Sequence, residues 1–244
     1  MLHADSGSYT WFDGIQKNEA RRKIGSLLET PNFYHYLSAS DNLDIAVAIK
    51  QRGKNDKERV LAKVGLLERK DTAFQTYSLG MKQRLAIGSA LLGYPEVLVL
   101  DEPTNGLDPA GIAEIRDLIR QLSEEGITII MASHLLDEVE KVCTHVAILK
   151  KGDLLLSGSV NETLHNDDVI EVKAQNEIAL LQLLTTMPGI KKANKIGDSI
   201  QLLTDDSLTS EDVNEYCMQN GIVLSHLVLK KKSLETKFME LTNH

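Results

Sequence analysis

"LVLDEPTNGLDPAG" (Leu98–Gly111) places two carboxylates, Asp101 and Glu102, directly behind an apolar run that predicts a buried strand. Adjacent anions repel each other, and holding them at the edge of a core is unfavourable unless a cation or a proton transfer uses them. A strand of a parallel sheet delivers the residues at its carboxyl end to the crevice where ligands bind. One carboxylate there can hold Mg²⁺ through water beside bound phosphates, and the next can polarise the water that attacks a γ-phosphate. The stretch therefore predicts a site for phosphoryl transfer at the end of a strand.

A helix and a second strand follow this stretch. Asp108 is a good N-cap and Pro109 a good first helical residue. The helix presents one apolar stripe at helical spacing and ends at Gly126; the stripe consists of Ile112, Ile115, Ile119 and Leu122. "ITIIMAS" (127–133) then predicts a second buried strand. Strand, helix and strand with continuous apolar strands indicate a parallel sheet covered on both faces.

Two further segments carry side chains suited to phosphate chemistry. His134 follows the second strand at its carboxyl end; a lone histidine is more often structural, but beside Asp101 and Glu102 it suggests contact with a γ-phosphate. In "YSLGMKQR" (77–84), Ser78 and Gly80 lie where a helix begins, and a helix N-terminus with a hydroxyl and a bare backbone can bind an anion. Taken alone, that second segment is better read as an ordinary N-cap.

The rest of the chain divides into three parts. Residues 6–15 and 21–29 read as short strands, and the helical patterns over 38–53, 56–67 and 79–94 predict a helical subdomain at about 36–92. "HVAILKKGDLLLSG" (145–158) predicts a strand pair around Lys151 and Gly152. After that the pattern restarts as strand, helix, strand, strand, helix, strand, which predicts a small ferredoxin-like α+β domain over 161–244 with an amphipathic terminal helix.

Composition limits the possible functions. The chain has 244 residues, a net charge of −8 and a sequence pI near 5.4, which argues against binding nucleic acid by charge. Its apolar runs are far too short to span a bilayer. The two cysteines, Cys143 and Cys217, have no metal-ligand spacing and are expected to be free thiols in a reducing cytosol.

Together, in this order and spacing, the motifs resemble those of ATP-binding cassette (ABC) transporter ATPases. "YSLGMKQR" looks like the family's signature motif, "EVLVLDEP" like its Walker B strand, "NGLD" like its D-loop and "SHLLDE" like its switch-histidine loop. The resemblance covers roughly residues 1–160 and implies a P-loop NTPase-like α/β cassette with ATP and Mg²⁺ as cofactors. It implies that Asp101 holds Mg²⁺ through water, that Glu102 is the general base and that His134 contacts the γ-phosphate.

The resemblance also implies a dimer. Ser78 and Gly80 would clamp a nucleotide that is bound to a second ATPase subunit, identical or different, and Asp108 would couple the two sites. Glu29 stands where the family normally carries a Gln that touches Mg²⁺ and the membrane partner. "ETPNFYHY" (29–36) around it is similar to the bacitracin and lantibiotic exporter group, as is the C-terminal tail.

One family motif does not occur in the chain. No G-x-x-x-x-G-K-[ST] loop is found among the 244 residues; Gly53 and Lys54 form the only Gly-Lys pair, and Asn55 follows them. The resemblance begins just after the family's first helix, so the cassette is expected to lack its N-terminal strands and Walker A loop, through either a misassigned start or a real truncation.

We therefore expect the ATPase subunit of a bacterial exporter, cytoplasmic and held at the inner face of the membrane by a membrane subunit. As given, the chain is expected to be inactive alone. The alternative is a non-catalytic subunit that completes a partner cassette's ATP site through its signature motif. A soluble ATPase acting on DNA or ribosomes is disfavoured by the acidic charge and the lack of a basic linker.

Overall fold

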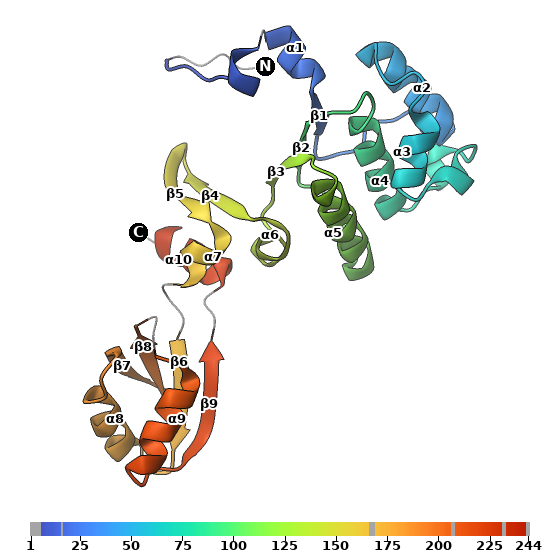
Figure 1. Ribbon diagram of the computed structural model, residues 1–244. Helices are drawn as coiled ribbons and strands as arrows, with labels where there is room; N and C mark the ends of the chain where they lie inside the picture. Colours follow the sequence, from blue (N-terminus) through green and yellow to red (C-terminus); the bar gives the residue numbers. More distant parts are fainter. Residues whose placement is uncertain (1–5, 16, 166–168, 206–207, 231–232, 243–244) are drawn as a thin grey trace. The chain divides into compact units, whose positions relative to one another are not determined.

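The structure is a computed structural model that describes residues 6–15, 17–165, 169–205, 208–230 and 233–242 (Figure 1). The chain forms two compact units, the first ending at Leu135 and the second beginning at Leu136. The predicted functional boundary near residue 160 is a different division and stays a prediction.

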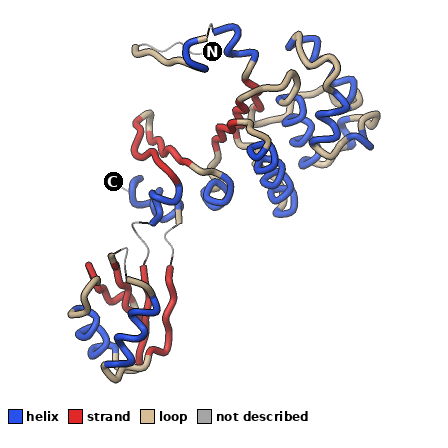
Figure 2. Tube along the Cα trace, in the orientation of Figure 1, coloured by secondary structure: helices blue, strands red, loops and turns tan. Residues whose placement is uncertain are grey.

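The first unit contains a parallel sheet and the helices that precede and separate its strands (Figures 1 and 2). In chain order, its elements are η1 (Phe12–Gly14), α1 (Lys17–Arg22), β1 (Ile24–Leu27), α2 (Ala39–Lys50), α3 (Lys57–Lys63), η2 (Leu67–Arg69), η3 (Phe74–Thr76), α4 (Leu79–Ala90), β2 (Val97–Asp101), α5 (Pro109–Glu124) and β3 (Thr128–Ala132).

The sheet has the order β1-β2-β3, and both strand pairs are parallel. Leu100 on β2 lies opposite Leu27 on β1 and Met131 on β3. All three strands therefore end at the same edge, as the sequence predicts for the carboxylate-bearing strand and its neighbour.

The two faces of this sheet are buried unequally within the described residues of the first unit, and the predicted cover on both faces stays a prediction. Leu98 and Leu100 are fully buried on the face where α4 and α5 pack. On the other face Ser26 is exposed, and Ile130 is 46% exposed although its strand was expected to be buried. The three strands lie in the sheet in the same order as in the chain. Right-handed crossovers therefore place the β1–β2 and β2–β3 connections on the same face of the sheet.

Residues 6–15 form no strand, contrary to the prediction. Phe12, Asp13 and Gly14 all have positive φ angles, and this turn interrupts the extended chain. No described strand pairs with this segment. A short alternating sequence becomes a strand only when a neighbour satisfies its backbone groups.

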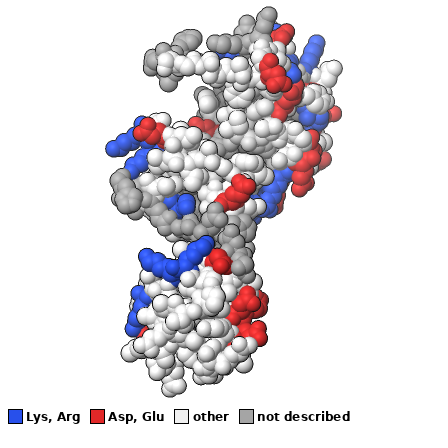
Figure 3. All heavy atoms as spheres, turned by 60° about the vertical axis from the view of Figure 1, so that its left-hand side comes forward, with Lys and Arg blue, Asp and Glu red and all other residues white. Residues whose placement is uncertain are grey.

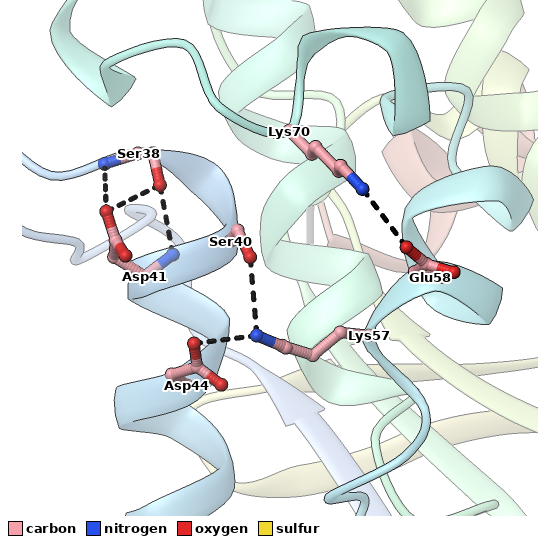
Figure 4. Close-up of polar contacts among 7 residues, drawn as sticks. All are labelled: Ser38, Ser40, Asp41, Asp44, Lys57, Glu58 and Lys70. Carbon is pink, nitrogen blue, oxygen red and sulfur yellow. Dashed lines mark hydrogen bonds and ion pairs between the residues drawn. The ribbon is translucent and has the colours of Figure 1, made fainter.

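The predicted helices over 38–53 and 56–67 are confirmed as α2 and α3. Ser38 begins α2 with a capping box, in which its hydroxyl accepts from the Asp41 backbone N–H at 3.1 Å and the Asp41 carboxylate accepts from the Ser38 backbone N–H at 3.2 Å (Figure 4). Lys57 on α3 donates to the Asp44 carboxylate at 2.7 Å and to the Ser40 hydroxyl at 3.3 Å, so the two helices are joined at the surface (Figure 4).

Buried polar contacts join this helical part to the sheet. The guanidinium of Arg52 donates to the carbonyl of Ile24, at the start of β1, at 2.9 Å. The Asp56 carboxylate, which is buried, accepts from the Gly93 backbone N–H at 2.8 Å. These bonds fix the approach of α2 and α3 to the strands.

We expect Lys50→Met to stabilise the protein at pH 7. Burial first, and Arg52 second, lower the pKa of Lys50 from its usual value of 10.5 to about 8. Between about pH 8 and 10.5 the unfolded chain then binds more protons than the folded one, so wild-type stability rises with pH across this window. Below it the folded state carries the full cost of the buried charge.

Removing the ammonium group relieves this cost but leaves the Ser89 carbonyl without the hydrogen bond from Lys50. The expected net gain at pH 7 is about 1–2 kcal/mol, with a flat profile from pH 8 to 10.5. Urea unfolding at pH 7, 9 and 10 measures the gain in the free energy of unfolding and its pH profile. Lys54→Met is the control, because Lys54 is exposed. Equal pH profiles for Lys50→Met and wild type would show that Lys50 does not titrate in this range.

The second unit begins with a helix and a β-hairpin and continues into a four-stranded sheet. Its elements are α6 (Leu136–Val142), β4 (His145–Lys150), β5 (Asp153–Ser159), α7 (Val160–His165), β6 (Val169–Ala174), α8 (Glu177–Thr185), β7 (Ile190–Ile196), β8 (Ser199–Thr204), α9 (Ser210–Gln219), β9 (Leu224–Lys230) and α10 (Leu234–Thr242). The predicted strand pair around Lys151 and Gly152 is present as β4 and β5.

The larger sheet has the order β7-β8-β6-β9, with every pair antiparallel. Together with α8 and α9 this is a ferredoxin-like arrangement. Its core joins alternate residues of β6 and β8 to the two helices and includes Ile170, Val172, Leu180, Leu184, Ile200, Leu202, Val213 and Cys217. Charges of both signs are spread over the face shown in Figure 3.

Candidate active site

The carboxyl edge of the β1-β2-β3 sheet gathers the predicted catalytic side chains. Glu29 lies two residues beyond β1, Asp101 ends β2 and Glu102 follows it, and His134 lies two residues beyond β3. Parallel pairing of the three strands explains why residues more than 100 positions apart in the sequence meet at this edge.

Glu102 and His134 form the central contact of the site. The Nδ1 atom of His134 lies 2.8 Å from Oε2 of Glu102. The Glu102 side chain is 22% exposed and that of His134 is 61% exposed, so the carboxylate is partly enclosed while the imidazole stays accessible. A carboxylate held in this way can accept a proton from a water molecule, and the imidazole can orient it.

The backbone of Glu102 is strained. Its φ angle is +47°, in the left-handed region that residues with a side chain seldom adopt, and its N–H donates to the Ala132 carbonyl at 2.9 Å. A hydrogen bond to the neighbouring strand therefore holds Glu102 in a conformation that costs of order 1 kcal/mol. Strain of this kind is common where a side chain must be aimed at a reacting group.

Asp101 is exposed at the end of β2, opposite Ala132. Its carboxylate makes no hydrogen bond or ion pair with the part of the chain that the structure describes, so it is free to bind a ligand. No group of three His, Cys, Asp or Glu side chains able to hold a metal ion occurs within the same part. One free carboxylate suits Mg²⁺ that takes its other ligands from water and phosphate, and in that sense Asp101 fits the predicted ion.

Glu29 is linked to the turn that follows Glu102. The side-chain amide of Asn105 donates to the Glu29 carboxylate at 3.2 Å, and the Asn105 backbone N–H donates to the Glu102 carbonyl at 3.1 Å. Asn105 is a site residue that sequence patterns alone do not indicate. Its place in "TNGLD" predicts a turn, but nothing in that pattern indicates a bond to a residue 76 positions away.

Ser78 and Asp108 each cap a helix. The Ser78 hydroxyl accepts from the Met81 backbone N–H at 3.2 Å at the start of α4, and the Asp108 carboxylate accepts from the Gly111 backbone N–H at 2.9 Å at the start of α5. The structure therefore supports the ordinary capping role of both residues. It does not test their predicted contact with a nucleotide.

The start of α4 is nevertheless open. A Cβ atom added at Gly80 would meet no atom within 4 Å, and the Leu79 side chain is 46% exposed. Gly106, in the turn after β2, has a positive φ angle. A Cβ atom added at this glycine would lie 3.3 Å from the Leu79 side chain. Packing inside the unit thus does not require glycine at position 80.

Comparisons with known proteins show which family the chain belongs to. Residues 7–139 match the family model described as "AAA domain, putative AbiEii toxin, Type IV TA system". The chain is 38% identical over 228 residues to the bacitracin transport ATP-binding protein BcrA of Bacillus licheniformis, covering 92% of this chain and 74% of that protein. It is 41% identical over 175 residues to the lantibiotic transport ATP-binding protein SrtF of Streptococcus pyogenes, covering 70% of this chain and 76% of that one.

Among solved structures, the chain is similar to cbiO1 from Clostridium perfringens, which is part of the ABC transporter complex cbiONQ. That similarity has a TM-score of 0.54 and 33% identity, and covers 62% of each chain. No helix in the described ranges has the length and apolar character that a membrane-spanning segment needs.

Proposed function

Because the chain belongs to the family of ABC transporter ATP-binding proteins, we propose that it serves as the ATP-hydrolysing subunit of a bacterial exporter of peptide antibiotics. The observation that carries this proposal is the Glu102–His134 contact of 2.8 Å beside the free carboxylate of Asp101. The export of peptide antibiotics rests on the similarity to the bacitracin and lantibiotic transport proteins.

Asp101 is the residue that would hold Mg²⁺, and a bound ion would supply positive charge beside the phosphate oxygens. Glu102 accepts the proton of the attacking water. His134 keeps the Glu102 carboxylate in place through Nδ1, which leaves its exposed Nε2 edge for the γ-phosphate. Phosphoryl transfer depends mainly on positioning and charge control, and these side chains are proposed to contribute in both ways.

The 244 residues do not provide a phosphate-binding loop. Gly53 and Lys54 lie in the turn between α2 and α3, and Asn55 follows them where the loop motif requires Ser or Thr. We propose that the loop for the Asp101–Glu102–His134 site comes from polypeptide outside these residues. In the second candidate function, Ser78, Gly80 and Asp108 instead complete the site of a partner ATPase that has its own loop.

We expect the chain as given to bind ATP weakly and to show no ATPase activity. Backbone N–H groups and the lysine of a phosphate loop normally provide most of the contacts to the triphosphate, and the chain has neither. Calorimetric titration with Mg²⁺–ATP and a phosphate-release assay measure both properties. Micromolar binding with turnover would overturn this expectation.

Mixing the chain with a related ATPase that contains a phosphate-binding loop distinguishes the two candidate functions. ATP-dependent association with that relative, lost in Ser78→Ala but not in the neighbouring Thr76→Ala, would support the completing role. No association would favour a site made by one longer polypeptide.

A membrane subunit is proposed to dock beside Glu29. Tyr34 and Tyr36 are 51% and 73% exposed and their ring centroids are 6.1 Å apart, whereas Phe33 packs edge-on against buried Phe74. The side chain of Asn42 fixes this loop by accepting from the Tyr34 N–H at 2.8 Å and donating to the Tyr34 carbonyl at 3.1 Å. A rigid loop with exposed aromatic side chains is well suited to an interface. This arrangement supports a cytoplasmic location at the inner face of the membrane.

Replacing Tyr36 by alanine is expected to uncouple ATP hydrolysis from transport. In a loop-complete protein, soluble ATPase activity should stay within about twofold of wild type, while transport by the assembled complex falls at least about tenfold, as for loss of an interface hot spot. Tyr94→Ala is the matched control, since Tyr94 is 68% exposed but stacks on Arg59 away from this loop. Equal losses of soluble hydrolysis and transport would contradict docking at this loop.

A further inference from the structure

Three cationic side chains gather where α1 and α2 end. Arg22 is the last residue of α1, Lys50 is the last of α2, and Arg52 lies two residues further on. Lys50 donates through Nζ to the Ser89 carbonyl at 2.5 Å, and Arg52 donates through Nη2 to the Ile24 carbonyl at 2.9 Å. Backbone carbonyls thus hold two of the three cations in place. We call these residues the cationic cluster.

No carboxylate neutralises the cluster within the described ranges of the chain. Arg22 is exposed and makes no hydrogen bond or ion pair there, and the ion pairs found for other lysines and arginines do not include Lys50 or Arg52. The Nη1 atom of Arg52 is buried without a hydrogen-bond partner. An unpaired buried donor destabilises the fold, and a nearby anion would offset the positive charge of the same guanidinium group.

The cations also repel one another. Burial first, and Arg22 second, lower the pKa of Arg52, while burial and then Arg52 lower that of Lys50. The contacts of the cluster agree with this: Gly25 lies against the Ala90 carbonyl, so the neighbouring carbonyls of Ile24 and Ser89, which accept from Arg52 and Lys50, lie in the same region, and Arg22 is two residues before Ile24. The cluster contrasts with Lys57, Lys63 and Lys70 of the same unit, each of which has an acidic partner.

The cluster lies at the other edge of the sheet from the candidate active site. Arg52 contacts Ile24, the first residue of β1, whereas Glu29 follows the last residue of that strand. In Figure 1 α1 leads directly into the start of β1. A ligand at this place is therefore separate from the Asp101–Glu102–His134 edge.

We propose that Arg22, Lys50 and Arg52 form a binding site for a phosphate-type oxyanion. Three adjacent cations favour a dianion over a single carboxylate, because a monoanion would leave most of the repulsion in place. Guanidinium groups bind phosphate oxygens through charge-assisted hydrogen bonds, and the tetrahedral ion offers acceptors in several directions at once. The free phosphate ion and the phosphomonoester headgroup of phosphatidic acid share this chemistry.

The test uses the 244-residue chain in low-salt buffer. Inorganic phosphate is expected to raise the midpoint of thermal unfolding above that in sodium chloride of equal ionic strength, because a ligand that binds only the folded state stabilises it. Arg22→Gln should raise the dissociation constant for phosphate about tenfold, as expected for the loss of one charge-assisted contact. Arg22 is exposed, so this variant is expected to fold; Arg52→Gln, which also loses the bond to Ile24, is the second variant.

The controls separate this site from others. Arg21→Gln changes the net charge equally, one position away on α1, and should keep wild-type affinity. Sedimentation with phosphatidic acid vesicles identifies the lipid source if Arg22→Gln reduces binding and Arg21→Gln does not. Equal responses to phosphate and chloride, or equal phosphate affinities of Arg22→Gln and Arg21→Gln, would overturn the proposal.

Discussion

Glu102→Gln is expected to lower ATP turnover by about 100-fold or more in a form of the protein that carries a phosphate-binding loop, with nucleotide still bound. A general base contributes on this scale, and an amide cannot accept the proton of the attacking water. The amide can still bond to His134, which lies 2.8 Å from the Glu102 carboxylate, so the shape of the site should persist. Phosphate release gives the turnover, and retained nucleotide after gel filtration gives the binding.

The matched control for this change is Glu124→Gln, at the exposed end of α5. It removes the same charge from the chain but lies outside the carboxyl edge of the sheet, and turnover should stay near wild type. A Glu102→Gln protein that hydrolyses ATP normally would mean that the proton of the attacking water is transferred elsewhere, and would remove the catalytic role assigned to the Glu102–His134 contact.

Gly25→Ala is expected to have the largest effect on stability. A Cβ atom at this position of β1 would lie 2.3 Å from the carbonyl oxygen of Ala90 and 2.7 Å from a methyl group of Leu98. Ala90 is the last residue of α4 and Leu98 is fully buried on β2, so neither can move without separating the helix from the sheet. Overpacking of this severity costs about 3 kcal/mol, a large part of the stability of a typical domain.

Chemical denaturation followed by circular dichroism measures this effect as a lower midpoint. Gly158→Ala is the control, because a Cβ atom on that strand would have its nearest neighbour, a Thr163 hydroxyl, at 3.6 Å. Similar midpoints for the two variants would show that α4 does not approach β1 as closely as described. Because α4 also carries Ser78 and Gly80, the same change should displace the start of that helix.

The parts of the fold that follow from local chemistry could be predicted from the sequence. Ser38, Ser78 and Asp108 each begin a helix with a side-chain cap, as their positions before helical patterns indicate. Residues at the carboxyl ends of parallel strands meet at one edge whatever the intervening loops, and this general rule placed Glu102 near His134.

Other features depend on distant neighbours that a single sequence does not reveal. Nothing around Gly25 indicates that the end of a helix 65 positions later leaves no room for a methyl group. Residues 6–15 alternate like a strand but have no described partner strand, and the turn at Phe12–Gly14 takes its place. The exposed face of β3 depends on the order of the three strands in the sheet. The hydrophobic pattern of a single strand does not reveal that order.

β3 has a further consequence for the chain in the cell. Its residues, Thr128–Ala132, include no charge and no proline, and the strand pairs on one side only within the described residues. Such an edge lacks the features by which proteins usually block strand addition, so newly made copies can adhere to one another. Chaperones and proteases act on surfaces of this kind. We therefore expect the cellular lifetime of the chain to depend on how quickly a binding partner covers β3. Copies made in excess of their partners would be degraded, so the abundance of the chain would match that of its partners.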